Sequence, residues 1–369
     1  MTVWWLTLLS TYILGLIARQ TARPVYTNGK LKYKNNVVYA SLACLILILV
    51  AGLRSGIGDT PAYVAGFEEY PDTLRGVWEF IKHGESKDKG FYALAMLIKT
   101  FISDNSQVYI FILSMITLTL IFISFYRNTE MIDLAIFLFI TTGCYLVTMN
   151  GIRQYLVSAI LFCAFPWIKQ KKWYLYLPLV IIVSTMHGSA LIFIPLYFIV
   201  NCPAWGRVTK LLILTGMILF ITYPVSGPLI ANILQESQYS DYENLLTSTG
   251  AGANFVRVAV MAVPLIMAYF GRDMLEGKEK YYNIIVNMSI INFFAILLAT
   301  RYWIYARFNM YFSLYMILLI IWCVKYLFDE RNTKIIYIMC LSLYGLYYWY
   351  EMAISLGQNY TSRYLTFWN

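Results

Sequence analysis

Long apolar runs recur from one end of the sequence to the other, and they limit the fold more than any other feature. A helix needs about 20 mostly apolar residues to cross a bilayer, and runs of roughly this length are repeated throughout the chain. Of the 369 residues, 60% are hydrophobic and 13% are charged, and the mean hydropathy is +0.63. The sequence therefore predicts an all-α, polytopic integral membrane protein with a single transmembrane domain over residues 1–369.

The distribution of lysine and arginine predicts how the helices are oriented. The first apolar run, Trp4 to Ile17, lacks a basic segment before it and a cleavage site after it, so we expect a retained span. Five bases and no acid follow it between residues 19 and 34. Such a loop is typical of the cytoplasmic side, which places the N-terminus outside. The net charge of +9 is then explained by cationic cytoplasmic loops and does not indicate a nucleic-acid partner.

Nine other runs are long enough to be full spans, and one stretch is ambiguous. Residues 173–200 form either one long span or a hairpin of two short helices broken at Met186-His187-Gly188. The hairpin keeps the later basic clusters inside, so we prefer it. This gives about 12 transmembrane helices with both termini outside. The full spans are expected at roughly residues 4–17, 36–53, 108–126, 132–148, 151–168, 211–230, 255–270, 281–299, 304–325 and 335–353.

Two polar segments are expected on the outer face. Residues 54–103 form an external loop in which seven acids outnumber five bases before residue 90. Within it, residues 91–102 are apolar but too short to cross, which predicts an interfacial or re-entrant helix. Residues 231–252 form the second external loop.

The sequence Asn150-Gly151-Ile152-Arg153-Gln154 separates two of the apolar runs. On a helix, Asn150, Arg153 and Gln154 would share one face because they are spaced i, i+3 and i+4. An arginine at membrane depth costs about 2.5–3.5 kcal/mol, so Arg153 should face a partner or a wet cavity. The alternatives are a buried ion pair that joins two helices and a site for a phosphate-bearing ligand.

Other polar residues are predicted to gather on the same outer face. Arginine stays charged and its planar fork matches phosphate oxygens, which favours an anion site. Each arginine could instead reach the lipid headgroups, Arg257 and Arg307 most readily, and the histidine could simply bond a backbone carbonyl. The residues concerned are Arg54, Asp59, His187, Arg257, Arg301 and Arg307.

The six cysteines lie in or beside apolar runs and show no CxxC spacing. Neither a disulfide framework nor a metal site is therefore predicted. No cofactor is expected.

Three elements together resemble the EpsG family, which are Wzy-type polymerases of bacterial exopolysaccharide. They are Arg54 with Gly58-Asp59-Thr60 and Tyr63, the Asn150–Gln154 element, and Met186-His187-Gly188-Ser189-Ala190. The resemblance covers nearly the whole chain and is compatible with a GT-C-like glycosyltransferase architecture. It implies a multi-pass protein of the bacterial cytoplasmic membrane with an extracytoplasmic active site, in a pathway of the kind that builds biofilm or capsule.

The resemblance also implies the substrate and the reaction. Oligosaccharide repeat units on undecaprenyl diphosphate would be joined at the outer leaflet, without a metal. Arg153 and Arg54, supported by Arg301, would hold the diphosphate, and Asp59 or His187 would be the base. Gln154, Asn150 and Tyr63 would orient the substrate, with Arg257 and Arg307 as further contacts. The flippase and the chain-length regulator of the same pathway are the expected partners.

Two other functions remain open from the sequence. A membrane glycosyl- or acyltransferase could use His187 as its base and would give one discrete product. A flippase or transporter of the same lipid-linked oligosaccharide would also suit this number of spans. Transporters often show two related halves, however, and no internal repeat is found here.

Overall fold

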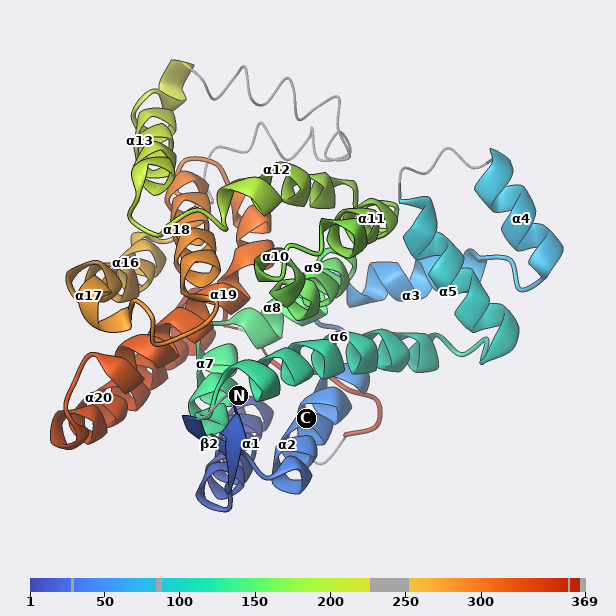
Figure 1. Ribbon diagram of the computed structural model, residues 1–369. Helices are drawn as coiled ribbons and strands as arrows, with labels where there is room; N and C mark the ends of the chain where they lie inside the picture. Colours follow the sequence, from blue (N-terminus) through green and yellow to red (C-terminus); the bar gives the residue numbers. More distant parts are fainter. Residues whose placement is uncertain (28–29, 84–87, 226–251, 358, 366–369) are drawn as a thin grey trace. The chain divides into compact units, whose positions relative to one another are not determined.

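The computed structural model (Figure 1) describes residues 1–27, 30–83, 88–225, 252–357 and 359–365. These residues are mostly helical, which confirms the all-α class apart from one short β-hairpin. Their contacts divide the chain into two compact units, Met1–Cys163 with Phe328–Asn369 (unit 1) and Ala164–Leu327 (unit 2). Each unit is described by itself.

Unit 1 holds the N-terminal helices, the polar segment 54–103 and the C-terminal helix. α1 packs on α2 and α7, and α2 packs on α6. The basic segment after α1 is a hairpin rather than a plain loop, in which β1 pairs antiparallel with β2. The elements are α1 (Thr2–Gln20), β1 (Arg23–Thr27), β2 (Lys30–Lys34), α2 (Val37–Gly52), α3 (Thr60–Glu69), α4 (Leu74–His83), α5 (Lys89–Phe101), α6 (Ser106–Asn128), α7 (Ile132–Thr141), α8 (Cys144–Asn150), α9 (Ile152–Ala164), α20 (Glu330–Trp349) and a π-helix (Tyr350–Ser355).

Unit 2 is built on the α18–α19 pair, whose residues are largely buried. The ambiguous stretch 173–200 breaks between Ser184 and Gly188, which is the predicted position. Most of the predicted loop 231–252 lies outside the described residues. The elements are α10 (Pro166–Lys169), α11 (Trp173–Ser184), a 3-10 helix (Gly188–Ile192), α12 (Phe193–Ile199), α13 (Arg207–Ile221), α16 (Phe255–Phe270), α17 (Arg272–Leu275), α18 (Tyr282–Ala299) and α19 (Tyr305–Tyr326).

Fewer helices are long and apolar enough to span than the sequence predicted. Within the described ranges, α1, α6, α18 and α19 qualify by length and composition, and the bent pair α7–α8 would be a fifth. The expected count of about 12 is therefore not found. The physical reason is that several predicted spans are interrupted. Four shorter apolar helices remain: α2, α11, α16 and the segment Gly188–Ile199.

Glycine explains one of these interruptions. Gly143 has a φ of 82°, which L side chains rarely adopt, and α7 and α8 meet there at an angle of 56°. The predicted span 132–148 is thus broken at Gly143. Gly151 ends α8 at the predicted boundary before the next span, with a φ of −83° and a ψ of 57°, and α9 starts at Ile152. The predicted span 151–168 is interrupted where α9 ends at Ala164 and α10 begins at Pro166, so non-helical backbone lies within both apolar runs. Such backbone is tolerated where protein or a wet cavity receives it.

Side chains from distant segments bind the carbonyls at the end of α2. Gln107 Nε2 donates to the carbonyl of Gly52 at 2.6 Å, and Tyr360 OH donates to that of Val50 at 2.9 Å. Ser362 Oγ donates to the carbonyl of Leu53 at 2.5 Å. The last carbonyls of a helix have no intrahelical partner, so these bonds fix where the chain leaves α2.

A buried carboxylate joins three helices of unit 1. Asp133 on α7 is fully buried, and its Oδ2 lies 3.0 Å from Arg19 Nη1 of α1. Tyr337 OH of α20 donates to the same oxygen at 2.6 Å and lies 2.9 Å from Tyr12 OH. Because the charge is buried, each of these hydrogen bonds offsets part of its desolvation cost.

We predict that Tyr337→Phe destabilises unit 1 by about 1.5–3 kcal/mol, as for hydrogen bonds to charged groups. Thermal unfolding in detergent measures the loss. The matched control is Tyr33→Phe, which removes an exposed phenol from β2 and should leave the midpoint unchanged. Equal midpoints for the two variants would show that the Asp133 cluster does not hold the helices together.

Candidate functional site

The guanidinium of Arg54 is buried at the end of α2, with 1% of the residue exposed. Its Nε donates to Thr60 Oγ1 at 2.8 Å, and its Nη1 donates to Ser114 Oγ at 2.9 Å. Nη1 also donates to the carbonyl of Ala51, and Nη2 donates to that of Met149 at 3.4 Å. Arg54 therefore ties the loop before α3 to α6 and α8.

All four of these acceptors are neutral oxygens. Burial lowers the pKa of Arg54 to about 10, so the guanidinium still carries its charge at neutral pH. A buried charge whose hydrogen bonds go only to dipoles leaves a positive potential around it, because no carboxylate among these acceptors cancels it. The surroundings of Arg54 thus favour an anion nearby.

Arg153 is the second residue of α9, and its side chain is 29% exposed. Its Nη1 donates to Asp88 Oδ2 at 2.8 Å and to Tyr92 OH at 3.3 Å, and its Nε donates to Tyr63 OH at 3.2 Å. The guanidinium carbon lies 5.9 Å from the ring centroids of Tyr63, Phe91 and Tyr92. The charge is thus held in an aromatic cage whose one carboxylate is Asp88.

Asn150 and the Gly58-Asp59 turn meet beside this cage. The backbone N–H of Asp59 donates to Asn150 Oδ1 at 3.1 Å. Gly58 has a φ of 54°, and a Cβ there would lie 2.5 Å from the same oxygen. Asp59 is half-exposed and precedes the first turn of α3. The turn and the α8–α9 break therefore position each other through one amide side chain.

The structure corrects the predicted helix face of residues 150–154. Asn150 ends α8, whereas Arg153 and Gln154 belong to α9, because Gly151 interrupts the helix between them. Gln154 is 2% exposed and does not point outward as Arg153 does. Asn150 and Arg153 are thus placed by two helices that meet at a break, and they do not share one face of a continuous helix.

Lys99 of α5 contacts the end of α3, and these two helices carry the aromatic residues of the cage. Its ammonium donates to the carbonyls of Phe67, Glu68 and Tyr70 at 3.0, 2.8 and 2.7 Å, which are the last carbonyls of α3. A cation is favoured at a helix C-terminus by both the hydrogen bonds and the helix dipole. α3 and α5 are thereby joined. The interfacial or re-entrant helix predicted at residues 91–102 corresponds to the helix α5, Lys89–Phe101, and its placement at the membrane stays a prediction.

The remaining predicted residues belong to unit 2. His187 is 5% exposed and precedes the 3-10 helix, and its ring lies 6.4 Å from that of Tyr311. Arg301 lies 4.6 Å from the Phe220 ring and Arg307 lies 5.8 Å from the Trp303 ring. Arg257 is half-buried in the first turn of α16.

Comparison with known protein families gives one match for this sequence. The sequence model of the EpsG family matches residues 37–365. The chain belongs to the EpsG family. The match includes every residue of the Arg54–Arg153 site and confirms the predicted resemblance. EpsG membership identifies a polysaccharide-associated membrane protein. No curated protein and no solved structure matches the chain.

Sequence reasoning missed Asp88, Tyr92 and Lys99. Asp88 was one of seven acids in the external loop, and nothing in its spacing distinguished it. Tyr92 follows Asp88, the N-cap of α5, by four residues, so its role becomes visible only once Asp88 is known to bind Arg153. In the described part of the chain, no group of three or more metal-ligating side chains is found.

We predict that Gly58→Ala disrupts the site, because the turn requires a positive φ and the added Cβ meets Asn150. A strained backbone of this kind costs about 1–3 kcal/mol. Thermal unfolding and polysaccharide yield measure the effect. Gly277→Ala is the control for backbone strain, since its φ of 78° is similar but a Cβ there meets nothing within 4 Å. If both variants lower yield equally, the Gly58–Asn150 contact is not what matters.

Proposed function

We propose that this EpsG protein is a membrane glycosyltransferase that polymerises oligosaccharide repeat units carried on undecaprenyl diphosphate at the outer leaflet. The single observation that supports it most is that two guanidiniums lie at one helix break. Arg54 is buried and its hydrogen bonds within the described residues all go to neutral oxygens, whereas Arg153 is partly exposed. The positive potential of the two suits a diphosphate leaving group. The cytoplasmic membrane is the proposed location, with the flippase and the chain-length regulator of the pathway as partners.

In the proposed reaction, an acceptor hydroxyl oxygen attacks the anomeric carbon of the donor sugar. The bond from that carbon to the diphosphate oxygen breaks, and the diphosphate leaves with the electron pair. Arg153 is assigned to its oxygens, because it alone of the two arginines is exposed. Arg54 acts at longer range through its charge and holds the turn in place. No metal is needed for this stabilisation.

The base that takes the hydroxyl proton is assigned to Asp59. Its carboxylate precedes α3 by one residue, and Tyr63, one turn further on, receives the Nε hydrogen bond of Arg153. Burial raises the pKa of Tyr63, so its phenol remains protonated and keeps one hydrogen to offer a sugar oxygen. His187 remains the alternative base, and Arg301, Arg307 and Arg257 remain proposed contacts of unit 2.

Asn150 and Gln154 are proposed as orienting residues. Asn150 is exposed and uses its carbonyl oxygen for the Asp59 N–H, which leaves its NH₂ group available to a sugar or phosphate oxygen. Gln154 is buried, so its contribution is to the packing that sets the start of α9. Neutral amides suit an oligosaccharide because they bond hydroxyls without adding charge.

We predict that Arg153→Gln lowers the polymerisation rate by about 10²–10³, as for loss of one donor that stabilises a leaving anion. The assay supplies purified protein with one lipid-linked repeat unit and resolves the products as a ladder. Arg75→Gln is the matched control, because Arg75 lies in the same external region with its side chain 91% exposed. Normal ladders from both Arg153→Gln and Arg54→Gln would refute the assignment. A single discrete product from the wild type would indicate simple transfer instead.

We predict that Asp59→Asn lowers the rate by about 10²–10⁴, the usual contribution of a general base. Asparagine keeps the shape of the side chain and the Asn150 hydrogen bond, which is made by the backbone. His187→Asn is tested in parallel. A large loss with His187→Asn and a normal rate with Asp59→Asn would transfer the role to the histidine.

A further inference from the structure

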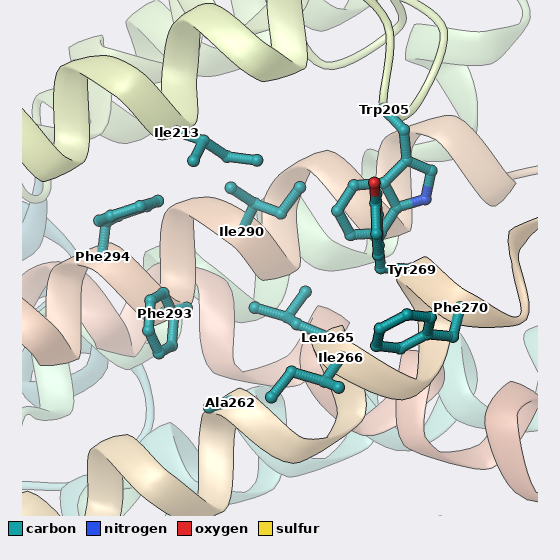
Figure 2. Close-up of a pocket in the computed structure, with 10 residues that line it drawn as sticks. All are labelled: Trp205, Ile213, Ala262, Leu265, Ile266, Tyr269, Phe270, Ile290, Phe293 and Phe294. Carbon is teal, nitrogen blue, oxygen red and sulfur yellow. The ribbon is translucent and has the colours of Figure 1, made fainter.

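Unit 2 contains an apolar groove between α13, α16 and α18, far in sequence from the Arg54–Arg153 site. Its volume is about 340 Å³. Figure 2 shows Phe293 and Phe294 at one end, Trp205 and Tyr269 at the other, and aliphatic side chains between them. The aliphatic lining includes Ile213, Ala262, Leu265 and Ile290.

The groove is held open by contacts on both sides of it. At one side, Thr209 of α13 donates to Asn287 Oδ1 of α18 at 2.8 Å. At the other, Gly216 lies against the Phe294 ring so closely that a Cβ would be 2.4 Å from it. On α13, Ile213 lies between the two contact positions Thr209 and Gly216. On α18, Ile290 lies between the contact positions Asn287 and Phe294. Two tight crossings with a gap between them make a preformed groove rather than a packing defect.

Its chemistry fits a hydrocarbon chain. Its lining side chains are all aliphatic or aromatic. Two of them are exposed on the protein surface, Ile266 by 53% and Phe270 by 79%, and the surface of such a helix is expected to face the bilayer. The volume is at the lower end of the range for small-molecule sites, about 300–1,000 Å³. It therefore suits part of one chain and not a whole lipid.

The aromatic end of the groove carries positive charge. Arg272 lies 5.0 Å above the Tyr269 ring, and its Nη1 donates to the Tyr269 carbonyl at 3.3 Å. Trp205 packs edge-on against the same ring. On α13, Lys210 precedes Ile213 by one turn, and both Lys210 and Arg207 are exposed. Including the nearby segment 272–280, five bases face three acids here.

This end is expected at the cytoplasmic surface, because lysine and arginine cluster on that side of membrane proteins. Aromatic rings at such an end mark the level of the headgroups. Basic positions beside an interhelical groove on this side attract anionic lipid headgroups. The groove is thus expected to open towards the cytoplasmic leaflet.

We propose that this groove binds one acyl chain of an anionic phospholipid from the inner leaflet, with the headgroup at Arg272 and Lys210. The bound lipid fills the space between α13, α16 and α18 and fixes their separation. The inference does not depend on the proposed function, since it uses neither the Arg54–Arg153 site nor the reaction.

The first experiment uses the full-length protein in vesicles of phosphatidylcholine with a minor share of phosphatidylglycerol. After extraction into mild detergent, native mass spectrometry counts the lipids that stay bound. Ala262→Trp fills the groove and should remove the retained phosphatidylglycerol. Val263→Trp is the matched control, because the neighbouring residue is 55% exposed and does not line the groove.

The second variant tests the headgroup. Arg272→Gln should lower the preference for phosphatidylglycerol over phosphatidylcholine by roughly fivefold, the effect of one base near a membrane surface. Arg272→Lys should restore most of that preference. Neither variant touches the residues assigned to polymerisation, so a failed polymerase assay leaves this test intact.

A third measurement uses the wild type and so avoids misfolded variants. Phosphatidylglycerol with a photoreactive group on its acyl chain is crosslinked in the same vesicles, and the labelled peptides are mapped. Labelling concentrated in residues 262–270 and 290–294, and competed by plain phosphatidylglycerol, supports the proposal. Equal retention of both phospholipids, unchanged retention in Ala262→Trp, or a retained polyprenyl phosphate would each overturn it.

Discussion

The buried guanidinium of Arg54 is the interaction on which the proposed site of unit 1 depends. Three carbonyl or hydroxyl partners of Arg54 come from outside its own helix, so the charge fixes the turn before α3 against α6 and α8. Moving such a group out of water is costly unless its donors are satisfied. The chain accepts that cost here without a carboxylate among the acceptors, which leaves the positive charge uncancelled. A charge kept in this way is more useful for attracting an anion than for stability alone.

Helix breaks supply the polar groups that a continuous span cannot. At Gly151 the backbone leaves one helix and enters another, and this exposes Asn150 while it turns Arg153 into the aromatic cage. An unbroken helix from 144 to 164 would keep all its backbone hydrogen bonds. It would lose the hydrogen bond between the Asn150 side chain and the backbone N–H of Asp59 in the Gly58-Asp59 turn. The break at Gly143 shortens one predicted span, and the break at Gly151 lets Asn150 meet the Gly58-Asp59 turn.

The fold class and the elements of the site could be predicted from composition and motifs, but their geometry could not. Long apolar runs identified α6, α18 and α19 within a few residues, and the break near His187 was placed correctly. Hydropathy alone overestimated the spans, because it does not register where a helix bends or ends inside an apolar run, as α7 does at Gly143. The partner of Arg153 was missed for a related reason. Asp88 is distant by 65 residues, and such a contact depends on how the external helices fold back.

The Arg153–Asp88 ion pair affects how strongly an anion binds at Arg153. Asp88 is 6% exposed, so it is held next to Arg153 by burial as well as by charge. A diphosphate that approaches Arg153 meets a guanidinium already half neutralised, and the carboxylate repels it. The pair therefore weakens the binding of any single anion. In the proposed function, the charge of Arg54 offsets this repulsion. The proposed diphosphate site therefore depends on both guanidiniums and not on Arg153 alone.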